Sequence, residues 1–477
     1  MKLMIDYNVI ISHKLSNDRW YESMSDIYEQ STITDIYFTT PEMKRVFSDA
    51  NKVQKQMDCE AALAEVEAEL GIIPKEMAEE IVKKSKVELI DFDALLVDFA
   101  RTGHPFIPLV HAYKKICDNN AGEYVHWGAT TQDILDTATT LQIREAYEIL
   151  MPRFEELYKV VAEKAEEHKN LVMVGRTNGQ HAMPITLGYK MAVWGFEIRE
   201  GIDRLKECEK RVFRGLFAGA VGTLAALQEN GLAIQEGLLN KLGLHVPPVA
   251  WSTSRNHYAE FINNLAIMAA SMAKIGNEVY ALQKSEIAEL EESQGAGSVG
   301  SSTMPHKRNP FRSMELATNA KLIRGYAETM MNALELEHER DPRSAAAEPL
   351  LLERTCSTVH ASVERAIKLV NNLVVYPENM ARNLEALHGL IFSEAIMMEL
   401  GKKLGRQTAH EILHELSMQA FKTRTSLKDL LKANKSVSSV LSDERIDDIM
   451  RAENYIGLAP LFAERLTVQK DAYFKNK

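Results

Sequence analysis

Apolar residues recur along most of this chain with the 3.6-residue period of an α-helix. In residues 261–282 the apolar positions step by three and four, at Leu265, Met268, Met272, Ile275, Val279 and Leu282. This spacing predicts a long helix that packs along another helix at a shallow angle. Residues 53–70 predict a second helix, which Gly71 ends. Residues 361–375 predict a third, which Pro377 ends.

The helical pattern predicts an all-α chain in three parts. No stretch alternates polar and apolar residues between turn signals, which argues against a sheet-based fold. We expect an N-terminal helical domain at 1–130, a central long-helix bundle at 131–376 and a C-terminal helical domain at 377–477. An apolar seam of this length is hard to cover within one chain, so a homo-oligomer is expected.

Composition narrows the class of protein. The 477 residues carry 56 Lys and Arg against 67 Asp and Glu, a formal charge of −11, which argues against a nucleic-acid partner. No run approaches the roughly 20 apolar residues of a membrane span, so no membrane association is expected. The four cysteines lie far apart, as in a cytoplasmic protein with reduced thiols. Neither a metal site nor a cofactor is predicted.

The stretch 295–310, GAGSVGSSTMPHKRNP, interrupts the helical pattern most strongly. Its glycines and serines predict a mobile loop. A serine among backbone N–H groups and near fixed cations can act as a base, because its alkoxide is stabilised there. Lys307, Arg308 and Asn309 would supply donors for a substrate carboxylate. The alternative is a solvated linker with an incidental pair of cations.

Two further polar stretches interrupt the helices. In His126–Asp136, Thr130 and Thr131 can cap a helix whose N-terminus faces an anion, or simply begin a well-capped helix. In 175–184 the polar side chains crowd one turn and suggest a lined pocket. They are Arg176, Thr177, Asn178, Gln180 and His181. His181 is either a proton donor or a structural histidine.

Four motifs together resemble the fumarase/aspartase superfamily. The loop ends in GSSTMPHKRNP, which matches that family's signature GSSxMPxKxNP at every defined position. HWGATTQD at 126–133, GRTNGQHAMP at 175–184 and HERD at 338–341 occur in the family's order. The resemblance extends from about Asp49 to Leu458.

The resemblance implies an all-α homotetramer with active sites shared between subunits. It also implies an anti-elimination from a small carboxylate substrate, in which Ser301 is the base and no cofactor takes part. Lys307 and Asn309 would bind the carboxylate that stores negative charge. The other substrate-binding positions would be His104, Thr130, Thr131, Arg176, Thr177, Asn178, Gln180, Ser302 and Met304.

Two branches of the superfamily share features with the chain. His104 in RTGHP and HERD at 338–341 resemble adenylosuccinate lyase. HWGATTQD at 126–133 and NYIGLA at 454–459 resemble 3-carboxy-cis,cis-muconate cycloisomerase.

Three departures argue against a nucleotide substrate. Tyr37–Phe38 replace an expected Arg-Tyr pair, and Ala345 and Pro349 replace a serine and an arginine that grip phosphate. Asn178 replaces the histidine expected as general acid, and an amide cannot donate that proton. The acid is then His181 or His126, or none is needed.

We therefore expect a lyase that releases fumarate or a related unsaturated acid from a succinyl or N-substituted aspartate compound, preferably by C–N cleavage. Three alternatives stay open. They are a cycloisomerase-type lactonisation, an adenylosuccinate lyase with altered phosphate contacts, and a non-enzymatic tetramer on the same scaffold.

Overall fold

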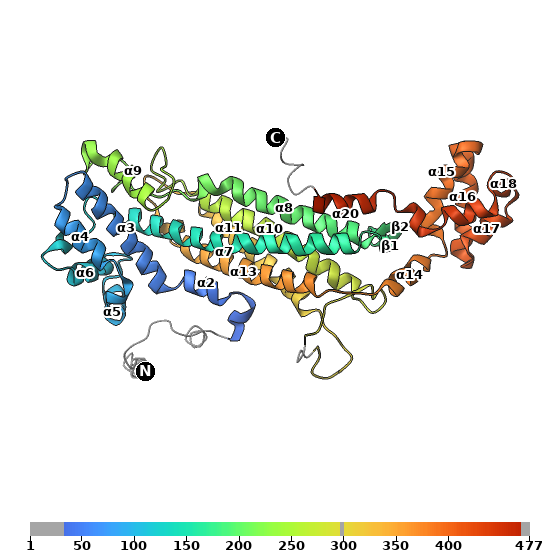
Figure 1. Ribbon diagram of the computed structural model, residues 1–477, viewed down its shortest axis with the longest axis horizontal. Helices are drawn as coiled ribbons and strands as arrows, with labels where there is room; N and C mark the ends of the chain where they lie inside the picture. The colour runs from blue at the N-terminus through green and yellow to red at the C-terminus, as the bar shows by residue number, and fades with distance from the viewer. Residues whose placement is uncertain (1–32, 296–299, 469–477) are drawn as a thin grey trace, which may run out of the picture. The chain divides into compact units, whose positions relative to one another are not determined.

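The computed structural model describes residues 33–295 and 300–468. Part of the predicted loop, residues 296–299, and both ends of the chain lie outside the described residues. Helices make up most of the described chain, which confirms the predicted all-α class (Figure 1). The chain divides into two compact units. This division does not test the predicted boundaries near 130 and 377, which stay predictions.

The first unit comprises Met1–Gln142 and Gly215–Pro248. Its helices and 3-10 turns are η2 (Ile33–Tyr37), α2 (Pro41–Val46), α3 (Asp49–Glu69), α4 (Lys75–Lys84), η3 (Val87–Leu89), α5 (Phe92–Thr102), α6 (Ile107–Ile116), η4 (Ala121–Tyr124), η5 (Gln228–Asn230) and α9 (Gly231–Lys241). Helix α3 packs against α4 and α9. The helix predicted at 53–70 is therefore confirmed, and Ser48 caps its start by accepting a hydrogen bond from the backbone N–H of Asn51.

The second unit comprises Ile143–Arg214 and Val249–Lys477, and the boundary falls within α7 (Thr131–Glu167). Its elements up to residue 385 are β1 (Val172–Thr177), β2 (Gln180–Thr186), α8 (Leu187–Val212), α10 (Asn256–Leu282), β3 (Leu290–Glu291), α11 (Phe311–Asn332), α12 (Pro342–Ala345), α13 (Glu348–Asn371), β4 (Val374–Val375) and α14 (Pro377–Glu385). The remaining elements are η6 (Leu390–Phe392), α15 (Ser393–Leu404), α16 (Arg406–Thr423), α17 (Leu427–Ala433), α18 (Lys435–Ser438), α19 (Asp443–Ile449), η7 (Ala452–Tyr455) and α20 (Ala459–Val468).

Long helices form the bundle of the second unit. Helix α10 packs against α8, α11 and α13, and these helices run side by side in Figure 1. All six apolar positions predicted on α10 are at most 1% exposed, so the heptad pattern identified its buried face. The third predicted helix ends earlier than expected, because α13 stops at Asn371 and Val374–Val375 pair with Leu290–Glu291. Pro377 begins α14 instead of ending α13, in the first-turn position where its missing N–H costs nothing.

A short antiparallel hairpin interrupts the helices between α7 and α8. Strands β1 and β2 pair in register from Val172↔Thr186 to Thr177↔Gln180. Asn178 and Gly179 form the two-residue turn, with φ of +52° and +75°. Both left-handed values are typical of a type I′ turn, for which Asn-Gly is a favoured pair. Asn178–Gly179 between two apolar runs is a signal for a hairpin, which the prediction of an all-helical pattern missed.

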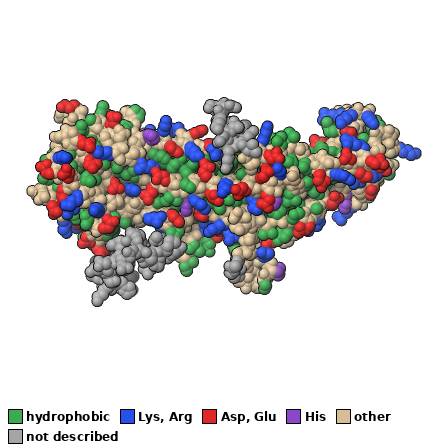
Figure 2. Space-filling model, in the orientation of Figure 1, with side chains coloured by type: hydrophobic (Ala, Val, Ile, Leu, Met, Phe, Trp, Pro, Cys, Tyr) green, Lys and Arg blue, Asp and Glu red, His purple; other side chains and the backbone are tan. Residues whose placement is uncertain are grey.

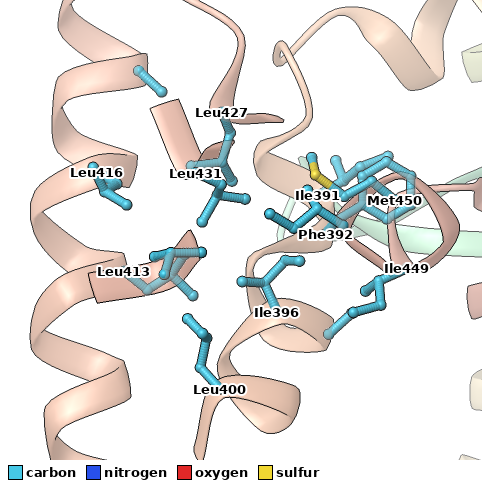
Figure 3. Close-up of a cluster of buried hydrophobic side chains, with 14 of the residues drawn as sticks. Ile391, Phe392, Ile396, Leu400, Leu413, Leu416, Leu427, Leu431, Ile449 and Met450 are labelled. Atoms are coloured by element: carbon cyan, nitrogen blue, oxygen red, sulfur yellow. The ribbon is translucent and has the colours of Figure 1, made fainter. Parts of the chain in front are cut away.

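The C-terminal helices of the second unit enclose an apolar core of their own. Leucine and isoleucine side chains from α15, α16, α17 and α19 converge there, together with Phe392 and Met450 (Figure 3). Leu400, Leu427, Leu431 and Ile396 are fully buried in this cluster. Val174 on β1 belongs to the same cluster, which ties the hairpin to these helices.

Charged side chains of both signs are interspersed over the face shown in Figure 2. Several charged residues of the described chain form ion pairs one helical turn apart, and such exposed pairs contribute little individually to stability. Within residues 33–295 and 300–468, no helix is long and apolar enough to cross a membrane.

One buried carboxyl group predicts a pH-dependent stability. Glu67 on α3 is 0% exposed, and neither carboxyl oxygen has a hydrogen-bond partner among the described residues. Burial, followed by the charge of Glu60, raises the pKa of Glu67 to about 8. The unfolded value is about 4.3. The stability that this protonated acid contributes is therefore complete below about pH 4 and is lost as the pH rises through about 8.

We expect Glu67→Gln to raise the melting temperature more at pH 9 than at pH 5. The amide cannot ionise, so it removes an alkaline penalty of roughly 1–3 kcal/mol. Thermal denaturation at both pH values measures the effect, with the exposed Glu88→Gln as control. Equal shifts at both pH values would contradict the assignment of a neutral carboxyl.

Candidate functional site

The predicted base, Ser301, lies among backbone donors. Its Oγ accepts hydrogen bonds from the N–H of Thr303 at 3.3 Å and of Met304 at 3.1 Å. Donors that converge on one hydroxyl oxygen stabilise it when it carries negative charge. The structure thus places two backbone donors at this hydroxyl, and the role of Ser301 as base stays a prediction.

The loop from Gly300 to Asn309 is closed by its own residues. The side-chain amide of Asn309 donates to the carbonyl oxygen of Gly300 at 2.6 Å. A Cβ at Gly300 would lie 2.6 Å from the carbonyl oxygen of Lys307, so no larger residue fits without a backbone shift. Asn309, predicted to bind substrate, thus already uses one amide hydrogen to hold the loop, while its second hydrogen and its carbonyl oxygen can still contact substrate.

Two glutamates of the preceding segment hold the C-terminal end of this loop and the start of α11. Arg308 forms an ion pair with Glu291 at 2.8 Å. Glu292 is 2% exposed and accepts from the backbone N–H of Arg312 at 3.0 Å and of Ser313 at 3.1 Å. It therefore satisfies two free N–H groups at the start of α11. Sequence reasoning missed both glutamates, whose only signal was acidic residues next to a basic loop.

Three other predicted residues of the loop are accessible. Ser302, Met304 and Lys307 are exposed. Lys307 has no ion-pair partner in the part of the chain that the structure describes. Its ammonium group is therefore available to a carboxylate ligand.

The hairpin holds five of the predicted residues. Arg176 on β1 donates two hydrogen bonds to the fully buried Glu289, at 2.8 and 2.9 Å. Asn383 on α14 also donates to Glu289, at 2.8 Å. Glu289 was not predicted, and it gives Arg176 a role in holding the hairpin. Substrate binding by Arg176 stays a prediction that depends on its remaining donors.

His181 lies opposite Arg176 in the strand register. Its Nδ1 is buried without a hydrogen-bond partner among the described residues. Burial, followed by the positive charge of Arg176, lowers the pKa of His181. Its ring is therefore neutral near pH 7, which disfavours it as an acid. Thr177 and Gln180 are exposed at the end of the same hairpin.

The pKa of His126, in the first unit, is shifted in the opposite direction from that of His181. Its Nδ1 lies 2.7 Å from Oε1 of Glu60, and its backbone N–H donates to Oε2 of Glu60 at 2.8 Å. Burial alone lowers the pKa of His126, but the hydrogen bond and charge of Glu60 outweigh it, and the pKa is raised. Of the two candidate acids, His126 is therefore the one whose surroundings favour the protonated ring.

A buried aspartate organises the turn that follows His126. Asp133 is 1% exposed and accepts from the backbone N–H groups of Thr130, Ala218 and Gly219 at 2.9–3.0 Å. Thr130 and Thr131 therefore lie at the start of α7, while capping by their hydroxyls stays a prediction. Sequence reasoning counted Asp133 only as part of the helix, although a buried carboxylate at a helix start is an organising feature.

His104 caps the neighbouring helix of the first unit. Its Nδ1 accepts from the backbone N–H of Phe106 at 3.2 Å and of Ile107 at 3.0 Å, at the start of α6. The proton of a neutral ring must then lie on Nε2, which can donate to a ligand. Among the described residues, no group of three or more potential ligands could hold a metal ion.

Comparisons with known proteins agree with these motifs. A family model described as "Lyase" matches residues 35–325, and one described as "Adenylosuccinate lyase C-terminus" matches residues 389–466. The chain is 41% identical to adenylosuccinate lyase of Methanocaldococcus jannaschii, over 91% of this chain and 94% of the relative. It is 37% identical to N-acetyl-S-(2-succino)cysteine lyase of Dickeya dadantii, over 89% of this chain and 93% of the relative.

A solved structure extends the likeness to the fold. The crystal structure of 3-carboxy-cis,cis-muconate lactonizing enzyme from Pseudomonas putida matches with a TM-score of 0.86 and 34% identity, over 91% of this chain and 98% of that chain. Family model, relatives and structure agree with the four sequence motifs, and the chain belongs to the fumarase/aspartase superfamily of lyases.

Proposed function

We propose that this lyase releases fumarate or a related unsaturated acid from a succinyl compound that is not a nucleotide. The observation that carries the proposal is the position of Ser301, whose Oγ accepts two backbone N–H groups inside the closed signature loop. Those donors lower the cost of the serine alkoxide, which is the form able to take a proton from carbon.

The reaction begins when Ser301 Oγ takes a proton from the carbon next to a carboxylate. The electron pair moves into that carboxylate, where the accessible ammonium of Lys307 stabilises the added negative charge. The pair then forms the carbon–carbon double bond as the bond to the leaving group breaks. The serine keeps the abstracted proton, and the leaving group takes the electrons of the broken bond.

We assign protonation of the leaving group to His126. Although burial opposes it, Glu60 raises the pKa of His126, whereas burial and the charge of Arg176 lower the pKa of His181, so His126 is the better candidate for a protonated donor. Asn178 at the hairpin turn contributes a hydrogen bond instead of a proton. An ammonium or thiolate leaving group needs least help from an acid.

The substrate is proposed to be small and to lack a phosphate. Ala345 and Pro349 offer no charge-assisted bonds to a dianion, which a nucleotide would require. The bond that the enzyme cleaves is proposed to be C–N. Cleavage of a C–S bond is also proposed, because the Dickeya relative is named for a succinylated cysteine. The Methanocaldococcus relative makes adenylosuccinate a necessary comparison.

Lactonisation of a carboxymuconate is the second candidate. The likeness to the Pseudomonas putida structure over 91% of the chain favours it. It uses the same carboxylate site and needs no leaving group.

A substrate panel tests the proposal. It contains an N-(2-succinyl) amine, an S-(2-succinyl) thioether, adenylosuccinate and 3-carboxymuconate. Ultraviolet absorbance measures fumarate formation from the three succinyl compounds and loss of the diene from 3-carboxymuconate. We expect kcat/KM for a succinyl amine or thioether to exceed that for adenylosuccinate by at least about tenfold, since one missing charged contact costs about 1.5–3 kcal/mol. Turnover of adenylosuccinate alone, or of carboxymuconate alone, would replace the proposed substrate class.

Ser301→Ala tests the base. We expect kcat to fall by about 10²–10⁴-fold, because the substituted side chain cannot accept the proton. Circular dichroism should be unchanged, and Ser285→Ala at an exposed turn provides the matched control. Near-normal turnover by the Ser301 variant would remove the serine from the mechanism.

Asn178→Gly tests whether Asn178 contacts substrate or serves only the hairpin turn. Glycine accepts the φ of +52°, so stability should change by less than about 0.5 kcal/mol. Loss of an amide contact with substrate should raise KM by up to about tenfold with little change in kcat. An unchanged KM would show that the residue serves the hairpin only.

We also propose a homotetramer with shared active sites. Large apolar side chains remain exposed on the two central bundle helices, which is typical of a surface covered by another copy. They are Ile267 and Tyr280 on α10 and Met314, Leu322 and Met331 on α11. Light scattering should give four times the chain mass of 53.7 kDa. A monomer that turns over substrate would contradict shared sites.

A further inference from the structure

We propose that Glu60 is a positioning residue for the lyase reaction, because it orients His126 and determines which ring nitrogen presents a proton to the substrate. The inference rests on the proposed function, in which His126 is the acid. Glu60 lies in the middle of α3, 66 positions before its partner in the chain. Neither periodicity nor motif pointed to this pair.

The carboxylate of Glu60 holds His126 at two points. One oxygen accepts from the backbone N–H at 2.8 Å, and the other lies 2.7 Å from the ring Nδ1. His126 has φ of +67°, a left-handed conformation that is uncommon for a non-glycine residue. Two contacts to one rigid carboxylate hold both the unusual backbone and the ring. Phe106 packs against the ring with centroids 5.1 Å apart and limits its rotation further.

This contact determines the tautomer of the ring. A carboxylate accepts hydrogen bonds, so Nδ1 must carry its proton in both charge states. The proton that is gained and lost therefore belongs to Nε2. When His126 donates this proton, the neutral ring that remains keeps its bond to Glu60, and no reorientation is needed.

The surrounding charges favour the protonated ring. Glu60 is 2% exposed, so its attraction for the imidazolium is weakly screened by water. Asp133 at the start of α7 adds to this attraction. Glu67, one heptad further along α3, has a pKa of about 8 and is mostly uncharged near neutral pH. It therefore adds little negative charge near the pair.

A merely structural role for Glu60 predicts different behaviour. If the carboxylate only satisfied a buried turn, its replacement would lower stability without moving the titration of the enzyme. A positioning role moves the pH at which activity is lost. The free-enzyme profile of kcat/KM separates the two, because its alkaline limb reports the pKa of an essential acid.

The test is Glu60→Gln, which keeps the size and one accepting oxygen but removes the charge. We expect the alkaline limb of kcat/KM to move to lower pH by about one unit, since a tenfold change in proton affinity follows loss of a buried charge partner. Activity should recover in part at acid pH, and kcat should fall more than KM changes. Glu67→Gln is the matched control, because it is the same substitution on the same buried face of α3. Its profile should match the parent protein.

A second readout does not depend on turnover. NMR titration of isotope-labelled histidine, assigned with His126→Gln, should show a lower His126 pKa in Glu60→Gln. An unchanged pKa would overturn the inference, as would a lowered pKa with an unchanged rate profile. If Glu60→Gln does not fold, Glu60→Asp should show an intermediate shift, and an unchanged titration there would likewise overturn it. If the parent protein turns over none of the compounds in the substrate panel, the proposed function is contradicted, and this result is distinct from an unchanged His126 titration, which contradicts the role of Glu60.

Discussion

The hydrogen bond from Asn309 to the carbonyl oxygen of Gly300 is the contact on which the proposed chemistry depends. It closes a loop rich in glycine and serine, whose open forms are favoured by chain entropy. Within this closed loop the N–H groups of Thr303 and Met304 converge on Ser301. A serine hydroxyl is otherwise far too weak a base to remove a proton from carbon, so the catalytic proposal depends on loop geometry before it depends on any charge.

Buried acidic side chains organise three of the segments that carry predicted site residues or flank them. Glu292 caps α11, Glu289 holds Arg176, and Asp133 joins the start of α7 to residues 218–219. Each of these carboxylates is at most 2% exposed and accepts several donors, which repays its desolvation. Part of the net charge of −11 is therefore internal. An acidic composition is compatible with an anionic substrate because these carboxylates are already paired, while the ammonium of Lys307 is not.

Periodicity and short motifs predicted the features that depend on residues close together in the sequence. The heptad seam of α10 and the start of α7 are determined by residues within one or two turns, and the serine loop is determined by a contiguous motif. The partners Glu60, Glu289 and Glu292 act across 66, 113 and 20 positions respectively, and no periodicity encodes such distances. The Asn178–Gly179 hairpin was missed for a different reason, since the polar side chains around it suggested a pocket before they suggested a turn.

The closed loop has a consequence for how such enzymes change specificity. The proposed base, its two donors and the hydrogen bond that closes the loop all come from ten consecutive residues, and a larger residue at Gly300 would require the backbone there to shift. In the proposed mechanism the groups for proton removal are thus encoded in one short segment, whereas Asn178, His181 and His126 come from separate segments. Relatives are named for a nucleotide, a thioether and a lactone, and under the proposal it is these separate segments, and not the serine loop, that would have to differ among such reactions.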